Sequence, residues 1–189
     1  MTNRKRLPEP WNSFLRDLDA IVTGLADLHC IGGFVITRRF GFARETADID
    51  VLSITPNEQT RALIDAGAKG SALHKKHKVY LDHVTAIQYY PEDYEQRLAE
   101  MYPGQLKRIR LLAPDAYDLA LMKLDRNIER DREDVKFLAR EGFIQGEELK
   151  RRYEKEMRPY VAHPEDRLDR NFALWLEMID EQIKANDHL

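Results

Sequence analysis

The amino-acid sequence predicts an α+β fold with a helical C-terminal half, on two observations. Strand-like and helix-like segments are mixed up to about residue 112, and only helix-like segments follow. We therefore expect a core over residues 1–112, with a mixed sheet flanked by helices. We expect residues 113–189 to form a helical region that packs on this core. The length of 189 residues fits one core with an appended helical segment.

The first part of the chain predicts two helices and two strands. Apolar residues recur every three or four positions from Trp11 to Leu28, which is typical of a helix with one apolar face. A strand is expected over Ile49–Ile54. Thr55-Pro56-Asn57-Glu58 then combines an N-cap with a capping-box glutamate, so we expect a helix that ends near Gly67. The β-branched and aromatic residues of Val79–Ile87 predict a second strand.

The remaining elements follow from proline positions and apolar spacing. Pro91 predicts the start of a short helix that ends near Met101, and Leu106–Leu112 predicts a third strand near a sheet edge because it contains three basic residues. The rest of the chain has helical periodicity only. Four helices are expected, over residues 114–124, 131–140, 147–157 and 165–184.

Composition excludes several classes of protein. Thirty Lys and Arg nearly balance thirty-three Asp and Glu, and the net charge of −3 argues against a generally basic nucleic-acid coat. The single cysteine, Cys30, excludes a disulfide framework within the chain and a multi-cysteine zinc site. No apolar segment follows the basic N-terminus and none is long enough to span a membrane. We expect a cytoplasmic protein with no membrane partner.

Two carboxylates at the start of a strand indicate a cation site. Asp48 and Asp50 are two residues apart, so in a strand both point to one face while Ile49 points to the other. Neighbouring carboxylates repel each other, and a divalent cation relieves that repulsion. Ligands that are all oxygen suit Mg²⁺. The alternative is a solvated strand end with two incidental acids.

The residues before this acid pair point to phosphate binding. Gly32 and Gly33 precede Asp48 by 16 and 15 residues, and paired glycines let the backbone approach a phosphate closely. Arg44 and Thr46 share the parity of the two acids, so an extended strand would place a cation and a hydroxyl beside them. An ordinary tight turn and a polar sheet edge are the alternatives.

The combined motif resembles the signature of the nucleotidyltransferase superfamily with the DNA polymerase β-like fold. That signature is a pair of small residues followed by Asp-hydrophobic-Asp, and here it reads Gly32-Gly33, then Arg44-Glu-Thr46-Ala-Asp48-Ile-Asp50. The Arg-x-Thr-x-Asp-Ile-Asp form is similar to small bacterial nucleotidyltransferases, including toxin components of the AbiEii kind. A second similarity lies in Pro114-Asp-Ala-Tyr-Asp-Leu and the helices after it. The resemblance covers about residues 10–140.

The resemblance implies a role for each matching residue. Gly32 and Gly33 would hold a nucleoside triphosphate, and Asp48 and Asp50 would bind Mg²⁺. Asp82, a mid-strand acid among apolar neighbours, is the expected third carboxylate of a two-metal site, with a salt bridge as the alternative. The family often has serine where this chain has Gly33, so arginines such as Arg38, Arg39 or Arg44 must supply more of the phosphate contact.

Downstream residues extend the expected site. Lys123 matches the helical lysine that contacts nucleotide phosphate in these families, with a solvated lysine as the alternative. Asp131 and Asp134 lie three residues apart, on one helix face, and either support the site by positioning a cation or have a structural role. His83, beside Asp82, is expected to pack or to support that carboxylate.

The segment from Ala66 to Leu81 suggests where the acceptor binds. It contains no acid, and Lys75, Lys76 and Lys78 make a local basic patch that suits an RNA or tRNA end. A solvated loop is the alternative. The resemblance thus implies a nucleoside monophosphate transferred from an NTP to a hydroxyl of RNA or protein, in a toxin-type enzyme. Two other hypotheses remain: a non-catalytic module that binds a cognate antitoxin, and an enzyme that modifies a small molecule.

Overall fold

The computed structural model describes residues 6–85, 87, 89–161 and 166–186. The chain divides into two units. Unit 1 contains residues up to Thr85 together with Leu98–Ala113, and unit 2 contains Ala86–Arg97 together with the chain from Pro114 onward. The boundary after Ala113 lies next to the one expected at 112/113, but the segment 86–97 groups with the helical unit. The expected packing of the helical region on the core stays a prediction.

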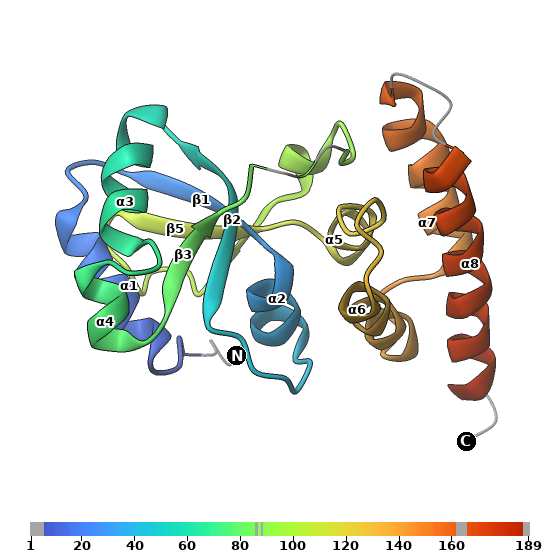
Figure 1. The fold of residues 1–189 in the computed structure, drawn as a ribbon, viewed down its shortest axis with the longest axis horizontal. Coiled ribbons are helices and arrows are strands. Elements are labelled where there is room, and N and C mark those ends of the chain that lie inside the picture. The colour runs from blue at the N-terminus through green and yellow to red at the C-terminus, as the bar shows by residue number, and fades with distance from the viewer. Residues whose placement is uncertain (1–5, 86, 88, 162–165, 187–189) are drawn as a thin grey trace. The chain divides into compact units, whose positions relative to one another are not determined.

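A five-stranded mixed sheet forms the centre of unit 1 (Figure 1). Its strands are β1 (Ala26–Ile31), β2 (Asp48–Thr55), β3 (Tyr80–His83), β4 (Ala99–Met101) and β5 (Ile109–Ala113). The order across the sheet is β3-β2-β1-β5-β4. Strands β1 and β5 and strands β2 and β3 pair in parallel, whereas the β1–β2 and β4–β5 pairs are antiparallel.

Helices cover both faces of this sheet. Figure 1 shows α1, α3 and α4 on one face and α2 on the other. The bounds are α1 (Trp11–Ile21), α2 (Gly32–Val35), which continues as the π-helical turn η1 (Ile36–Phe40), the 3₁₀ turn η2 (Asn57–Gln59), α3 (Thr60–Gly67) and α4 (Ala72–His77). Ile49, Val51 and Leu81 are buried, and Gly67 of α3 lies against Leu81. The residues of β2 and β3 that alternate with these three therefore point to the other face, where α2 lies.

The helix expected over Trp11–Leu28 is wrong in its second half. Helix α1 ends at Ile21, and residues from Ala26 form β1. The mistake has a physical cause: β1 lies between β2 and β5 and is buried on both faces, so its apolar residues do not alternate with polar ones. Ile21 and Leu25, which the helical pattern placed on the apolar face, are exposed.

Other differences from the expected elements are local. The strand expected over Val79–Ile87 ends at His83, and the short helix expected up to Met101 is a 3₁₀ turn, η3 (Tyr94–Arg97), followed by β4. The basic segment before β3 contains α4, which had no expected counterpart. Strand β5 lies second from the edge, in agreement with its expected place near one.

Unit 2 is helical. Its elements, besides η3, are α5 (Ala116–Leu121), α6 (Glu129–Arg140), α7 (Gly146–Arg152), the turns η4 (Tyr153–Met157) and η5 (Arg158–Tyr160), and α8 (Asp166–Asn186). Helices α6 and α7 both contact α8, which buries Trp175. The rings of Tyr153 and Phe172 stack with centroids 4.0 Å apart. The expected α+β class with a helical C-terminal half is confirmed.

No helix in the described ranges is long and apolar enough to cross a membrane.

A buried carboxylate fixes the start of β5. Asp19 of α1 accepts hydrogen bonds from the backbone N–H groups of Lys107, Arg108 and Ile109, at 3.1, 2.8 and 2.7 Å. Asp19→Ala leaves these three donors without their acceptor, and we expect unit 1 to lose about 3 kcal/mol of unfolding free energy. Urea denaturation in a Trp175→Phe background measures this, because Trp11 then reports on unit 1 alone.

The matched control is Asp27→Ala, which removes a carboxylate paired with Arg110 at the surface. Exposed pairs of this kind contribute less than about 1 kcal/mol. Equal losses for the two variants would contradict the role assigned to Asp19.

Candidate functional site

The two acids at the start of β2 lie on one face of the sheet. Ile49 is completely buried, whereas Asp48 and Asp50 on either side of it are half-buried. Because side chains alternate along a strand, both carboxylates point to the face of the sheet that α2 covers. This is the arrangement that the spacing predicts.

Strand β3 brings a third carboxylate to the same face. In the parallel β2–β3 pair, Asp50 lies opposite Asp82 and Asp48 lies opposite Tyr80. Residues opposite each other on neighbouring strands share a face, and the strands are about 4.8 Å apart. Asp82 is exposed, so the expected burial among apolar neighbours is wrong: β3 is an edge strand and leaves this side chain open to solvent. Its place beside Asp50 comes from strand register instead.

Thr46 and Tyr80 hold the carboxylate of Asp48. The Thr46 hydroxyl donates a hydrogen bond to Asp48 Oδ1 at 2.7 Å, and the Tyr80 hydroxyl lies 3.5 Å from Oδ2. Burial raises the pKa of the Tyr80 phenol, and the negative charges of Asp48, Asp82 and Asp50 raise it further. The phenol therefore stays protonated beside the three carboxylates and remains a hydrogen-bond donor.

Gly32 lies directly against Asp50. Strand β1 ends at Ile31, which pairs with Asp50, and the chain then turns over that carboxylate with a φ of 65° at Gly32. A Cβ atom at this position would lie 1.7 Å from Asp50 Oδ2. Only glycine satisfies both the left-handed backbone and this close approach. The contact brings the backbone of the Gly-Gly turn to the acid pair.

Gly33 adjoins the two polar residues that precede β2. A Cβ atom there would lie 2.9 Å from Arg44 Nη2 and 3.3 Å from Thr46 Oγ1. The structure thus brings together six of the expected site residues: Gly32, Gly33, Arg44, Thr46, Asp48 and Asp50.

The single cysteine, Cys30, is buried in β1 and stays protonated. Burial raises the pKa of its thiol, and the negative charge of Asp50 raises it further.

The carboxylate oxygens of Asp48 and Asp50 suit a hard divalent cation, but these two side chains supply only part of its ligands. Within the described parts of the chain, no group of three or more His, Cys, Asp or Glu side chains is arranged to hold a metal ion. Mg²⁺ is usually held by one or two carboxylates together with phosphate oxygens of a substrate. Asp48 and Asp50 therefore fit a cation that is shared with a bound phosphate chain.

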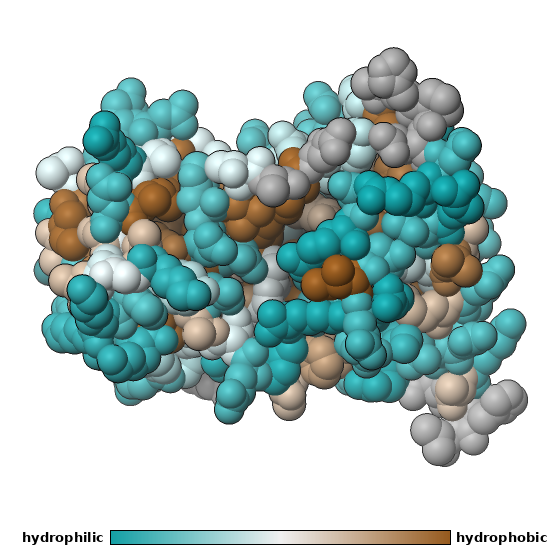
Figure 2. Space-filling view, viewed as in Figure 1, coloured by the Kyte–Doolittle hydropathy of each residue, from teal (hydrophilic) through white to brown (hydrophobic). Residues whose placement is uncertain are grey.

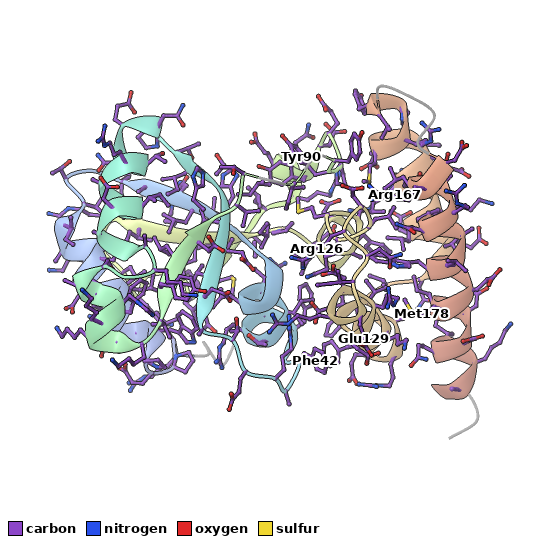
Figure 3. All side chains as sticks on the ribbon, viewed as in Figure 1. Phe42, Tyr90, Arg126, Glu129, Arg167 and Met178 are labelled. Atoms are coloured by element: carbon purple, nitrogen blue, oxygen red, sulfur yellow. The ribbon has the colours of Figure 1, made fainter. Side chains whose placement is uncertain are left out.

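Lys123, expected at the nucleotide, forms a buried ion pair within unit 2. Its ammonium lies 3.0 Å from Asp134 Oδ2 and 3.4 Å from Asp131 Oδ1, and all three side chains are buried. Arg126, labelled in Figure 3 between α5 and α6, also donates to Asp131. Both acids thus hold Lys123 inside unit 2, which fits the structural alternative as well as the positioning one. A phosphate contact by Lys123 stays a prediction.

The pKa of Asp131 reflects this pairing. Burial alone would raise it, but the hydrogen bonds from Arg126 and the charge of Lys123 outweigh burial and lower it. A lowered pKa in the folded state stabilises unit 2 above the pKa of the unfolded chain, about 3.9. That contribution is lost as the pH falls through the folded pKa.

The other expected residues have distinct surroundings. His83 alternates with Asp82 along β3, so it points to the opposite face from the carboxylates. Lys75 and Lys78 are exposed. The Lys76 ammonium lies 2.7 Å from Asp17 Oδ2, and the same oxygen lies 2.7 Å from His77 Nε2.

Three further residues lie near the carboxylates: Tyr80, which had no expected role, and Lys69 and His74, which belong to the acid-free basic segment before β3. The Lys69 ammonium lies over the Tyr80 ring, 5.6 Å from its centroid, and the His74 ring meets Tyr80 edge-on at 5.1 Å. The parity of Tyr80 with Asp82 was a usable signal for Tyr80. The other two depend on the fold of the segment before β3.

Comparison with known families assigns the chain. A family model described as "Nucleotidyltransferase of unknown function (DUF6036)" matches residues 15–184. The chain belongs to this family. The resemblance to nucleotidyltransferases is thereby confirmed, and the match extends through the helical unit, beyond the range that the motifs covered. No curated protein and no solved structure matches the chain.

The contact between Gly32 and Asp50 can be tested against a second glycine. Gly32→Ala combines a strained backbone, which costs about 1–3 kcal/mol, with displacement of the Asp50 carboxylate. Gly41→Ala is the matched control, because Gly41 also has a positive φ, of 90°, but nothing lies within 4 Å of its Cβ position. Urea denaturation should show the larger loss of stability for Gly32→Ala. Equal losses would contradict the close contact.

Lys123→Met removes the cation that the buried Asp131 and Asp134 share, and Asp131 keeps its hydrogen bonds from Arg126. We expect a loss of about 3–5 kcal/mol of unfolding free energy in unit 2 at pH 7. The charge of Lys123 helps to lower the pKa of Asp131, so the difference from the unsubstituted protein should shrink as the pH falls toward 4. Urea denaturation in a Trp11→Phe background measures this through Trp175.

Lys136→Met, which removes a surface pair with Glu133, is the control and should cost less than about 1 kcal/mol. A Lys123→Met penalty that is no larger, or that does not change with pH, would count against the buried network.

Proposed function

We propose that this protein is a Mg²⁺-dependent nucleotidyltransferase that moves a nucleoside monophosphate from an NTP to a hydroxyl group of RNA, tRNA or protein. The observation that carries the proposal is the contact of Gly32 with Asp50, whose strand neighbour is Asp82. This contact places a turn that is suited to phosphate binding beside carboxylates that are suited to cation binding. Membership of a nucleotidyltransferase family supports the same chemistry.

The phosphate-binding part is the Gly-Gly turn with Arg44. Neither glycine carries a side chain, so the triphosphate can approach the backbone N–H groups of the turn. Arg44, whose guanidinium adjoins Gly33, offers a fork of donors that matches phosphate oxygens. Arg44 thereby replaces the hydroxyl that a serine at position 33 would offer.

Asp48 and Asp50 would hold the Mg²⁺, and Asp82, opposite Asp50 on β3, would be the third carboxylate of the site. The bond from Thr46 and the nearby Tyr80 hydroxyl orient Asp48. Mg²⁺, when bound, lowers the pKa of the attacking hydroxyl and offsets the charge of the phosphates. The exposed position of Asp82 leaves room for the acceptor to reach it.

The reaction is an in-line displacement at the α-phosphorus. The acceptor oxygen forms a bond to the α-phosphorus, and the bond from that phosphorus to the bridging oxygen breaks. The bridging oxygen takes the electron pair, and pyrophosphate leaves. Asp82 accepts the proton of the attacking hydroxyl. Positioning by the Gly-Gly turn and the carboxylates supplies much of the rate.

The biological setting that we propose is a toxin-type enzyme, with a cognate antitoxin protein as its partner. This part rests on the likeness of Arg44-Glu-Thr46-Ala-Asp48-Ile-Asp50 to toxin nucleotidyltransferases.

The test is transfer of label from each α-³²P NTP to total RNA and to total protein in the presence of Mg²⁺. We expect Asp48→Asn and Asp50→Asn to lower the transfer rate by about 10²–10³-fold each, because both remove charge that offsets the phosphates. Asp65→Asn is the matched control: it removes an exposed carboxylate of α3 that pairs with Arg61, and should leave the rate unchanged.

A fluorescent NTP analogue supplies a second measurement. Its binding should require Mg²⁺ and should weaken in the Asp48 and Asp50 variants. Absence of both transfer and Mg²⁺-dependent binding would overturn the enzymatic proposal and favour a non-catalytic module. Transfer to a small molecule alone would overturn the polymer acceptor.

A further inference from the structure

The face that holds the three carboxylates has two different flanks. On the β1 side, Gly32 and α2 adjoin Asp50. On the other side, β3 is the edge of the sheet, and a bridge between Ala68 and Leu81 brings the preceding chain alongside it. Lys69, the residue after this bridge, therefore lies at the open edge next to Tyr80.

Side-chain contacts hold Lys69 and His74 in place around Tyr80 at this edge. The Lys69 ammonium lies 5.6 Å from the centroid of the Tyr80 ring, whose hydroxyl is 3.5 Å from Asp48 Oδ2. His74 Nδ1 accepts a hydrogen bond from the Gly70 N–H at 2.9 Å, so the neutral ring has its proton on Nε2. The Ser71 hydroxyl accepts from the His74 N–H and caps α4. Both a cation and a donor thus lie around Tyr80.

The lysines of this segment are not equivalent. Residues 66–81 contain no acid. Lys69, Lys75, Lys76 and Lys78 are all exposed, and Lys76 forms an ion pair with Asp17. Figure 2 shows hydrophilic side chains over the α4 corner of unit 1. Three exposed cations besides Lys76 therefore lie in the segment that leads into β3: Lys69 over the Tyr80 ring, Lys75 in α4 and Lys78 at the C-terminal end of α4. The charge of Lys76 is partly neutralised by Asp17.

We propose that this edge binds the acceptor, and that the acceptor is the end of a single-stranded RNA. The inference rests on the proposed function: with the triphosphate at the Gly-Gly turn, the attacking hydroxyl arrives from the flank of Asp82. Lysines beside an aromatic ring are the surroundings in which proteins bind single-stranded phosphodiester chains. Lys69 pairs with the terminal phosphate, and Lys75 and Lys78 pair with phosphates farther along the strand.

The test is fluorescence anisotropy of a labelled ten-nucleotide single-stranded RNA over a range of salt concentrations. The variant is Lys69→Gln/Lys75→Gln/Lys78→Gln. Each phosphate contact contributes about 0.7 to the slope of log affinity against log salt for a single strand. We expect the slope to fall by about 2 and the Kd to rise about tenfold at 0.1 M salt.

Two controls match this variant. Lys150→Gln/Lys155→Gln/Lys184→Gln removes the same charge from exposed positions of unit 2, and should leave the slope unchanged. Lys76→Gln should change the slope less than Lys69→Gln does. Circular dichroism checks that each variant is folded.

Binding of the fluorescent NTP analogue separates this proposal from the proposed function. We expect the triple variant of the β3 edge to bind the analogue as the unsubstituted protein does. Normal nucleotide binding with unchanged RNA affinity and slope would overturn the RNA site and leave the nucleotidyltransferase intact. Tighter binding of poly-glutamate than of RNA would overturn it in favour of an acidic protein acceptor.

Discussion

The arrangement of the site depends on one close approach, that of the Gly32 backbone to the carboxylate of Asp50. Any side chain at position 32 would occupy the place of the carboxylate oxygen. The approach follows from the β1–β2 pair, which ends where Ile31 faces Asp50. Buried Ile49 and Val51 fix the opposite face of β2, so the strand cannot turn its acids away without exposing its apolar residues. The core therefore determines which way the acids point.

The part of the site that could be predicted from the sequence is the part that is local in the chain. Asp48 and Asp50 share a face by alternation, and paired glycines before them mark a close backbone approach whatever lies elsewhere in the fold. The third carboxylate depends on the register of β3 against β2, which joins residues 32 positions apart. Asp82 was found by resemblance, and its exposure at a sheet edge was not foreseen. Lys69 depends on the bridge of Ala68 to Leu81, which no local pattern reveals.

The fold shows the same division. Helices with one exposed face, such as α6 and α8, are visible in the sequence because burial follows their period. The first half of strand β1 falls within the helix expected up to Leu28, because both faces of the strand are buried and its apolar residues do not alternate with polar ones. Lys123 is a different case: the resemblance implied a phosphate contact, and the structure shows that two carboxylates hold its ammonium inside unit 2. A spacing of three between Asp131 and Asp134 is equally suited to a metal, a substrate or an internal cation, and only the tertiary structure distinguishes them.

The chain enters the helical unit twice, once between β3 and β4 and again after β5. The first of these two segments ends at Arg97, whose guanidinium pairs with Asp118 and Glu156, two residues that are synthesised later. The Glu92 N–H likewise donates to the carbonyl oxygen of Glu156. During synthesis, residues 86–97 therefore leave the ribosome before the partners of Arg97, which follow it by 21 residues (Asp118) and 59 residues (Glu156). The two units are interleaved along the chain, and neither can be excised as one continuous piece of the gene.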